Sequence, residues 1–166
     1  MELLVVLLIV GILVAVALPQ YEFAVMKSRA ATLLPILKNI VNAQDVYYMA
    51  NGSFARDFVD LDIDVPSGGE IWKNSAGFES VKYPKWQIDL ERQQVSGSIF
   101  QQDKIAIMYQ LDYSYELDSG HFPGQKKCIA FDQGGSIAEK VCKSFGGSRL
   151  SGGTSLGQSY VAWRVP

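Results

Sequence analysis

An unbroken apolar segment near the N-terminus limits what this chain can fold into more than any other feature. The sixteen residues from Leu3 to Leu18 include no charged or polar side chain. As a helix this segment is ~24 Å long, which is shorter than the ~30 Å hydrocarbon core of a bilayer. The rest of the chain is polar on average, so the mean hydropathy of +0.08 conceals a polar domain attached to an apolar rod.

Length and charge exclude several classes of protein. The 166 residues suit one domain with an appended element, and this length argues against a multidomain enzyme. A net charge of -2 and a pI of about 5.4 disfavour a protein whose main task is to bind nucleic acid.

A cleaved signal peptide is one alternative for the apolar segment. Such a peptide needs a basic region before the apolar residues and a small-residue cleavage site after them. No Lys or Arg precedes Lys27, and the segment continues through Pro19 into a further helical pattern. These observations favour a helix that stays in the mature protein.

Glu2 stands at the edge of the apolar segment. An unpaired carboxylate in hydrocarbon costs a few kcal/mol, and no basic residue lies within helical reach of it. One interpretation is an acid favoured by the helix dipole. The other is a carboxylate whose cationic partner belongs to another molecule.

Three short motifs lie within this apolar helix: Met1–Val6, Gly11–Leu13 and Ala17–Tyr21. They place an acid, a glycine, a proline and an aromatic residue at fixed positions. Together they closely resemble the N-terminal helix of bacterial type IV pilins and of type II secretion pseudopilins. The resemblance covers about the first 25 residues.

The resemblance implies a processing history and an assembly role. In that family a prepilin peptidase removes a leader ending in glycine, and the new amino terminus is methylated a few apolar residues upstream of the matching glutamate. We therefore expect the leader and the first mature residues to precede this sequence. The resemblance also implies that Glu2 pairs with the N-terminal ammonium of a neighbouring subunit, and that Gly11 and Pro19 belong to the assembly helix.

The helical pattern continues beyond the apolar segment to about residue 50. One face repeats at 3–4 spacing and comprises Met26, Ala30, Leu33, Leu37, Ile40, Gln44 and Tyr47. This amphipathic half needs a sheet to cover it. A helix over residues 2–50 is ~73 Å long, which suits a stalk whose lower part leaves the head. We therefore expect residues 1–25 to form the membrane and assembly half and residues 26–166 to form the globular head.

Two prolines interrupt the predicted helix. Each removes a backbone hydrogen bond and crowds the preceding turn. Pro19 is expected to kink or locally melt the helix, and Gly11 is a second position where the helix can bend easily. Pro35 is expected to bend the helix beneath the head. The alternative is that the first helix ends at Pro19.

Residues 51–85 are expected to form a connecting loop after a helix end at Asn51 and Gly52. Within it, apolar residues alternate with Asp60, Asp62 and Asp64 over residues 59–65. A calcium loop would need a glycine after the third acid and a bidentate glutamate, and neither occurs there. The alternation predicts an extended segment with solvated acids, and no metal site or cofactor.

The remaining chain predicts an antiparallel meander of about four strands. The candidates are residues 86–91, 95–101, 104–113 and 126–131, with residues 160–165 as a last strand or a packed tail. Together with the long helix, these strands predict an α+β fold. Residues 146–159, rich in Gly and Ser, are expected to form a surface loop.

Cys128 and Cys142 are separated by thirteen residues. In an exported protein an even, close pair is most simply a disulfide, contributing about 3 kcal/mol on the chain-entropy model. The resemblance supports it, because many type IV pilins close a C-terminal loop in this way. Between the cysteines, residues 136–145 predict a short helix with a capping box of Ser136 and Glu139.

Charge is distributed unevenly along the chain. After Ser119 there are six basic and two acidic residues, a balance of +4, so the preceding part carries -6. A basic C-terminal face could contact the acidic residues 57–70 of another copy. Solvated surface and DNA capture are the alternatives.

Catalytic motifs are missing from the sequence. His121 is the only histidine, within a predicted turn over residues 119–124, and no nucleophile elbow, zinc or phosphate-loop motif occurs. The expectation is a non-enzymatic type IV pilus subunit with the pilin fold. It would be held in the inner membrane and then form a homo-oligomeric extracellular filament with the help of a pilus assembly machinery.

Two alternatives to the pilus subunit stay open. The first is a type II secretion pseudopilin, although major pseudopilins carry a calcium site near the C-terminus in place of a disulfide-closed loop. The second is a monomeric membrane-anchored binding domain, in which the helix is only a tether.

Overall fold

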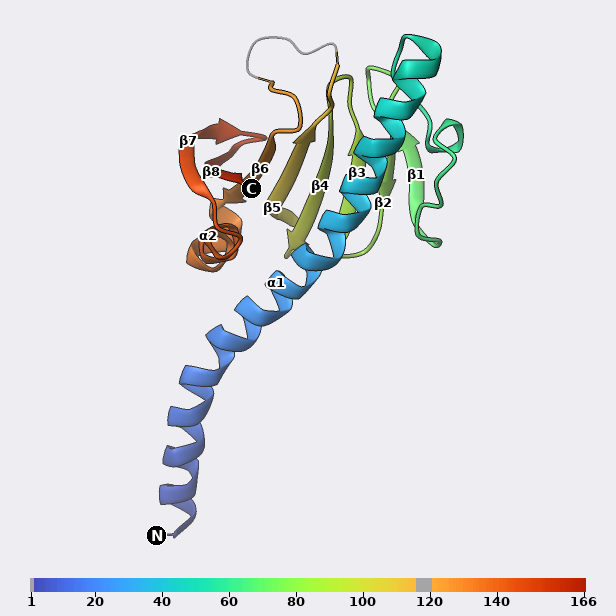
Figure 1. The fold of residues 1–166 in the computed structure, drawn as a ribbon. Helices are drawn as coiled ribbons and strands as arrows, with labels where there is room; N and C mark the ends of the chain where they lie inside the picture. Colours follow the sequence, from blue (N-terminus) through green and yellow to red (C-terminus); the bar gives the residue numbers. More distant parts are fainter. Residues whose placement is uncertain (1, 116–120) are drawn as a thin grey trace.

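The computed structural model describes residues 2–115 and 121–166. It shows an α+β chain in which one long helix leaves a head built on a single antiparallel sheet (Figure 1). The long helix α1 spans Glu2–Asn51, and a second helix, α2, spans Gly135–Ser144. The lower half of α1 is a stalk, and the upper half of α1 lies across the sheet.

Helix α1 is continuous across both prolines. Pro19 and Pro35 lie inside its 50 residues, so the alternative that the helix ends at Pro19 is wrong, and no local melting interrupts it. Its axis bends between the stalk and the head (Figure 1). A proline removes one hydrogen bond and can be accommodated by bending.

The sheet contains eight strands in the order β1-β2-β3-β4-β5-β6-β8-β7, with every neighbouring pair antiparallel. Their bounds are β1 Glu70–Lys73, β2 Glu79–Lys82, β3 Trp86–Leu90, β4 Gln94–Gln101, β5 Lys104–Asp112, β6 Lys126–Phe131, β7 Ser148–Ser155 and β8 Gln158–Val165. The four predicted meander strands are therefore confirmed as β3 to β6. The last candidate is confirmed as part of β8.

The prediction of about four strands is wrong because three further strands lie in segments expected to be loops. Strands β1 and β2 belong to the supposed connecting loop over residues 51–85, and β7 replaces the surface loop over residues 146–159. All residues of β1 and β7 are exposed, so neither strand carries the apolar alternation of a half-buried strand. They form the two edges of the sheet.

The core lies between the upper half of α1 and one face of the sheet. The predicted stripe of α1 is buried at Met26, Ala30, Leu33, Leu37, Ile40 and Gln44. Gly97 of β4 faces this stripe, because a Cβ added there would lie 2.8 Å from Leu33 Cδ2 and 2.8 Å from Leu37 Cδ1. The glycine therefore lets the helix backbone approach the central strand closely.

The segment after α1 is anchored to the helix by a buried amide. The Gln44 side chain accepts a hydrogen bond from the Ala55 amide and donates one to the Ala55 carbonyl, both at 2.9 Å. The alternation over residues 59–65 predicts a strand or an extended segment, and no strand is formed there. Instead a short 3-10 helix, η1 (Phe58–Asp60), directs Phe58 and then Leu61 into the core.

Helix α2 confirms the predicted short helix but not its capping box. The helix begins at Gly135 directly after a 3-10 turn, η2 (Asp132–Gly134), and Gly134 occupies the N-cap position without a side-chain hydrogen bond. Ser136 therefore lies inside the first turn and is not the N-cap. The helix ends before Phe145 and Gly146, close to the predicted position.

Candidate assembly surface

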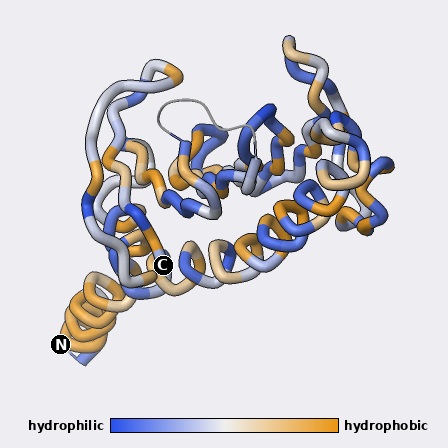
Figure 2. The backbone as a smooth tube through the Cα atoms, turned by 45° about the horizontal axis from the view of Figure 1, so that its top comes forward, coloured by the Kyte–Doolittle hydropathy of each residue, from blue (hydrophilic) through white to orange (hydrophobic). Residues whose placement is uncertain are grey.

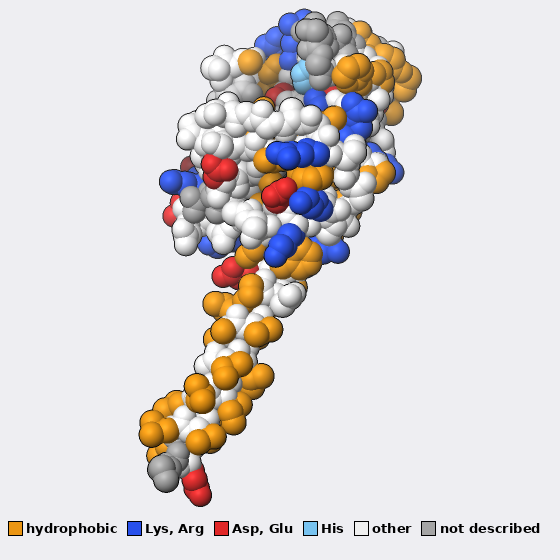
Figure 3. Space-filling view, turned by 90° about the vertical axis from the view of Figure 1, so that its left-hand side faces the viewer, with side chains coloured by type: hydrophobic (Ala, Val, Ile, Leu, Met, Phe, Trp, Pro, Cys, Tyr) orange, Lys and Arg blue, Asp and Glu red, His pale blue; other side chains and the backbone are white. Residues whose placement is uncertain are grey.

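The apolar half of α1 is exposed along its whole length. Large apolar side chains from Leu3 to Leu18 have exposed fractions from 50% at Val10 to 78% at Leu3. Figures 2 and 3 show this half as a continuous hydrophobic rod below the head. The helix is long and apolar enough to cross a membrane, and none of its most apolar window is buried within the molecule.

Glu2 is exposed at the free end of this rod. Within residues 2–115 and 121–166, no cation lies within ion-pair distance of its carboxylate. If the rod is transferred to an apolar environment, the unpaired carboxylate costs a few kcal/mol. A partner for Glu2 therefore has to come from outside the described part of this chain.

Gly11 and Pro19 lie on the same exposed half of the helix, whereas Pro35 lies beside the head. A Cβ added at Gly11 would meet no atom within 4 Å, so packing inside the molecule does not require a glycine there. Pro35 borders an apolar groove with Leu111, Phe145 and Val165. The predicted assembly residues are thus spread along the exposed half of α1 and do not converge on a pocket.

The predicted bond between Cys128 and Cys142 is confirmed. Their Cα atoms are 5.6 Å apart, and both side chains are fully buried. The bond joins β6 to α2, as expected from the sequence. It fixes α2 at the base of the head, where α2 lies next to α1 (Figure 1).

A buried carboxylate in β5 organises a cluster that the sequence did not single out. Asp112 lies 3.0 Å from His121 Nδ1, 3.5 Å from Lys127 Nζ and accepts a 3.0 Å hydrogen bond from the Phe122 amide. In the sequence, the signal for this cluster was Asp112, an acid at the end of a strand of mostly apolar residues. The cluster attaches the chain around His121 to the end of β5.

The predicted turn around His121 is partly observed. The Gln125 amide donates a 2.9 Å hydrogen bond to the Phe122 carbonyl, which closes a turn over Pro123 and Gly124. Ser119 and Gly120, where the predicted turn begins, lie outside the described residues.

The acids near β1 include an ion pair and do not converge on a metal site. Lys73 Nζ lies 2.6 Å from the Asp57 carboxylate, and this hydrogen bond raises the pKa of Lys73. In the part of the chain that the structure describes, no group of three potential His, Cys, Asp or Glu ligands is found. Asp60, Asp62 and Asp64 are exposed on the surface.

Comparison with known proteins gives no relative. No protein-family model, no curated protein and no solved structure matches this chain.

Proposed function

We propose that this chain is a structural subunit of a type IV pilus-like filament and polymerises through the apolar half of α1. The observation that carries the proposal is the exposed apolar rod from Leu3 to Leu18. Fully burying one Leu, Ile or Val side chain contributes ~1.5–3 kcal/mol, so a rod of such residues is strongly driven out of water. Something outside the head must cover it.

Two environments can cover the rod in turn. Before assembly the rod lies in the inner membrane, where lipid chains surround it. In the filament, the same residues pack against the rods of neighbouring copies, so lateral helix packing replaces lipid contacts. Gly11 leaves open space on this surface, which permits a neighbouring helix to approach closely.

In this proposal, Glu2 fixes the axial position of each subunit relative to its neighbours in the filament. A carboxylate buried in the apolar filament core is tolerated only when a cation neutralises it. The resemblance to pilins points to the N-terminal ammonium of a neighbouring subunit as that cation. One carboxylate per copy, paired with one ammonium, would fix how far each subunit rises relative to the next.

The processing partners and locations follow from the resemblance. A prepilin peptidase and a pilus assembly machinery would act on the membrane-held subunit. The product would be an extracellular homo-oligomeric fibre used in adhesion, motility or uptake. The buried Cys128–Cys142 bond favours this pilin role over a type II secretion pseudopilin. A monomeric membrane-anchored binding domain would explain the rod but would leave Glu2 without a partner.

Substitution of Glu2 tests the proposal directly. Glu2→Ala, expressed in the native cell with its own leader, leaves the neighbouring ammonium unpaired, and we expect more than about a tenfold loss of sheared filament. The measurement is the amount of subunit in the sheared and membrane fractions by immunoblot. Glu22→Ala is the matched control, because Glu22 is exposed on the same helix beyond the apolar rod. Normal filament from Glu2→Ala would contradict the role of Glu2.

A further inference from the structure

A groove of about 500 Å³ lies where α1 leaves the apolar rod and passes α2. One wall comes from α1 and the other from α2, and together they comprise Pro19, Gln20, Phe23, Ser136, Ile137, Lys140, Lys143 and Ser144. The Cys128–Cys142 bond holds α2 in this position.

The groove lies at the depth of lipid headgroups when the rod is in a membrane. The α1 wall begins one residue after Leu18, the last residue of the apolar run, and extends to Phe23. At 1.5 Å per residue, this wall lies ~2–8 Å beyond the apolar boundary. The headgroup region of a bilayer extends roughly 5–8 Å beyond the hydrocarbon on each side.

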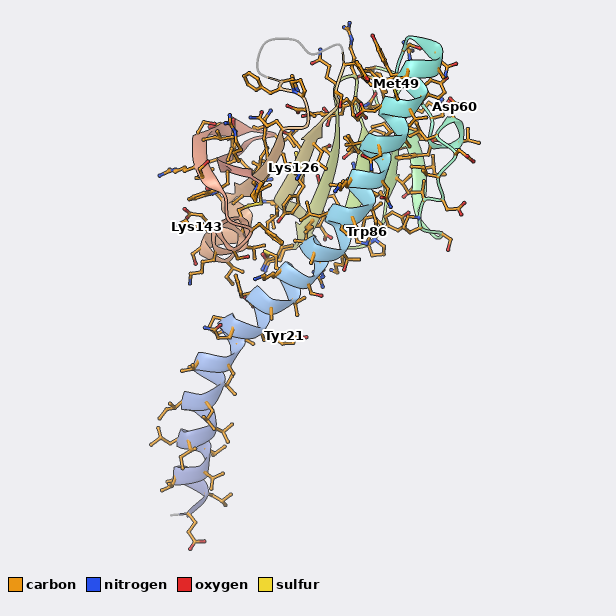
Figure 4. The ribbon with its side chains drawn as sticks, in the orientation of Figure 1. Tyr21, Met49, Asp60, Trp86, Lys126 and Lys143 are labelled. Atoms are coloured by element: carbon orange, nitrogen blue, oxygen red, sulfur yellow. A yellow bond between two sulfur atoms is a disulfide. The ribbon has the colours of Figure 1, made fainter. Side chains whose placement is uncertain are left out.

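The groove presents two ammonium groups. Lys140 is exposed and has no ion pair or hydrogen bond among the residues that the structure describes. The ammonium group of Lys143 already has two partners, because its Nζ lies 3.2 Å from Glu139 and 5.1 Å from the centre of the Trp163 ring. Figure 4 labels Lys143 on the outer side of α2 near the stalk, and Figure 3 shows basic side chains on the lower head directly above the hydrophobic rod.

Other charged groups near the groove do not cancel this positive charge. On α1, Glu22 and Lys27 flank the wall and have opposite signs. On α2, Glu139 offsets one of the two lysines, which leaves an excess of one positive charge. Ile137 and Phe23 add apolar surface beside the ammonium groups. A basic and apolar surface of this kind is typical of segments that lie in a membrane interface.

We infer that, before assembly, α2 docks on the membrane surface and that the groove binds the phosphate of an anionic phospholipid through Lys140 and Lys143. This inference rests on the membrane-held state in the proposed function and adds a specific lipid contact to it. The contact would hold the head at one orientation on the membrane. Extraction of a subunit into the filament would have to break it.

The test uses the full chain, labelled with ¹⁵N, in lipid nanodiscs that contain a headgroup spin-labelled lipid. Discs of phosphatidylcholine are compared with discs containing 30% phosphatidylglycerol, and with phosphatidylcholine discs in added inorganic phosphate. The readout is paramagnetic broadening of the amides of α2 and of residues 19–23. We expect stronger broadening in the phosphatidylglycerol discs alone, decreasing as salt is added.

Lys140→Gln/Lys143→Gln should abolish that difference, because the loss of two interfacial charges lowers the docked-to-free ratio by roughly 30-fold. The matched control is Lys38→Gln/Arg92→Gln. Lys38 lies ~30 Å along α1 from Leu18. Arg92 precedes Gln93, whose carbonyl accepts the Tyr113 amide near the far end of the head. Retained amide dispersion in both variants shows that they are folded.

Three results would overturn the inference: equal broadening in both lipids, unchanged broadening in the Lys140/Lys143 variant, or an equally strong increase in broadening when inorganic phosphate is added to phosphatidylcholine discs. Each of these leaves the filament proposal standing. A chain that does not enter discs at all would contradict the membrane anchor, and with it both proposals.

Discussion

Gly97 shows how one missing side chain sets the distance between helix and sheet. Leu33 and Leu37 are almost fully buried, and their methyl groups occupy the space that a Cβ at position 97 would need. Both neighbours are side-chain ends, so they can move, but they lie in a filled core. Overpacking of such a site costs ~1–3 kcal/mol.

Gly97→Ala is therefore expected to lower the free energy of unfolding by ~1–3 kcal/mol, measured by urea denaturation of the full chain in detergent. Gly11→Ala is the matched control, because its added methyl group meets no atom within 4 Å and lies in a helix, where alanine is favoured. If both variants were equally stable, close packing at Gly97 would not explain the glycine.

Asp89 on β3 is an acid whose ionisation opposes folding. Burial raises its pKa above the ordinary 3.8, and the hydrogen bond that it accepts from the Gln87 side chain lowers it only in part. The folded state therefore binds the proton more tightly than the unfolded state does. Consequently the stability contributed by this group is present at low pH and is lost as the pH rises from about 4 through the folded-state pKa.

Asp89→Asn should remove this pH dependence and raise the Tm at pH 7, as measured by calorimetry between pH 3 and 8. Asp60→Asn serves as the control, since Asp60 is exposed on the surface. A lower Tm for Asp89→Asn at neutral pH would show that the ionised carboxylate stabilises the strand through its hydrogen bonds instead.

At the scale of elements, the disulfide determines where α2 lies. The bond joins α2 to β6, and α2 in turn contacts α1 at the base of the head. The buried side chains of Ala138 and Val141 also pack α2 into the core of the head, although its N-terminus lacks a side-chain cap. The bond and this packing together hold α2 beside Pro19 and so form the groove.

Cys128→Ala/Cys142→Ala should lower the free energy of unfolding by about 3 kcal/mol, as expected for closing a loop of this size. Equilibrium denaturation of the variant and of the oxidised protein gives the difference. Mass spectrometry of the native protein provides the check, because neither thiol should react with an alkylating agent until reductant is added. Alkylation of both cysteines without reductant would contradict the assignment.

The elements that could be predicted from the sequence are those with an apolar pattern. The 3–4 stripe of α1 and the apolar residues of β3 to β6 mark segments that are buried in the head, so these patterns could be identified in the sequence. Strands β1 and β7 are fully exposed and are held by main-chain pairing to a neighbour, which leaves no apolar signature. The alternation over residues 59–65 did not predict the local structure correctly, because Phe58 and Leu61 reach the core from a 3-10 turn and not from a strand.

The candidate site was predictable to the extent that it is local. Glu2, Gly11 and Pro19 lie within one helix, so a motif in the sequence could identify them. The groove could not be found in this way, because folding alone brings residues 19–23 next to residues 136–144. The same holds for Asp112 and His121, which are nine residues apart in the sequence and lie 3.0 Å apart in the fold.

As a whole, the molecule has two parts that require different surroundings. The head has its own core between α1 and the sheet, and the face of the head drawn in Figure 3 carries charged side chains of both signs. Within the residues that the structure describes, the lower half of α1 has no such covering. The central claim is that other copies of the same helix cover this half in a filament, after lipid has done so in the membrane.

Electron microscopy of fibres sheared from the native cells, with mass spectrometry of their main subunit, tests this claim most directly. The account predicts thin filaments containing this chain, with the residues from Leu3 to Leu18 packed together along the fibre axis. Recovery of the protein only as a membrane-bound monomer, with no fibre containing it, would contradict the account.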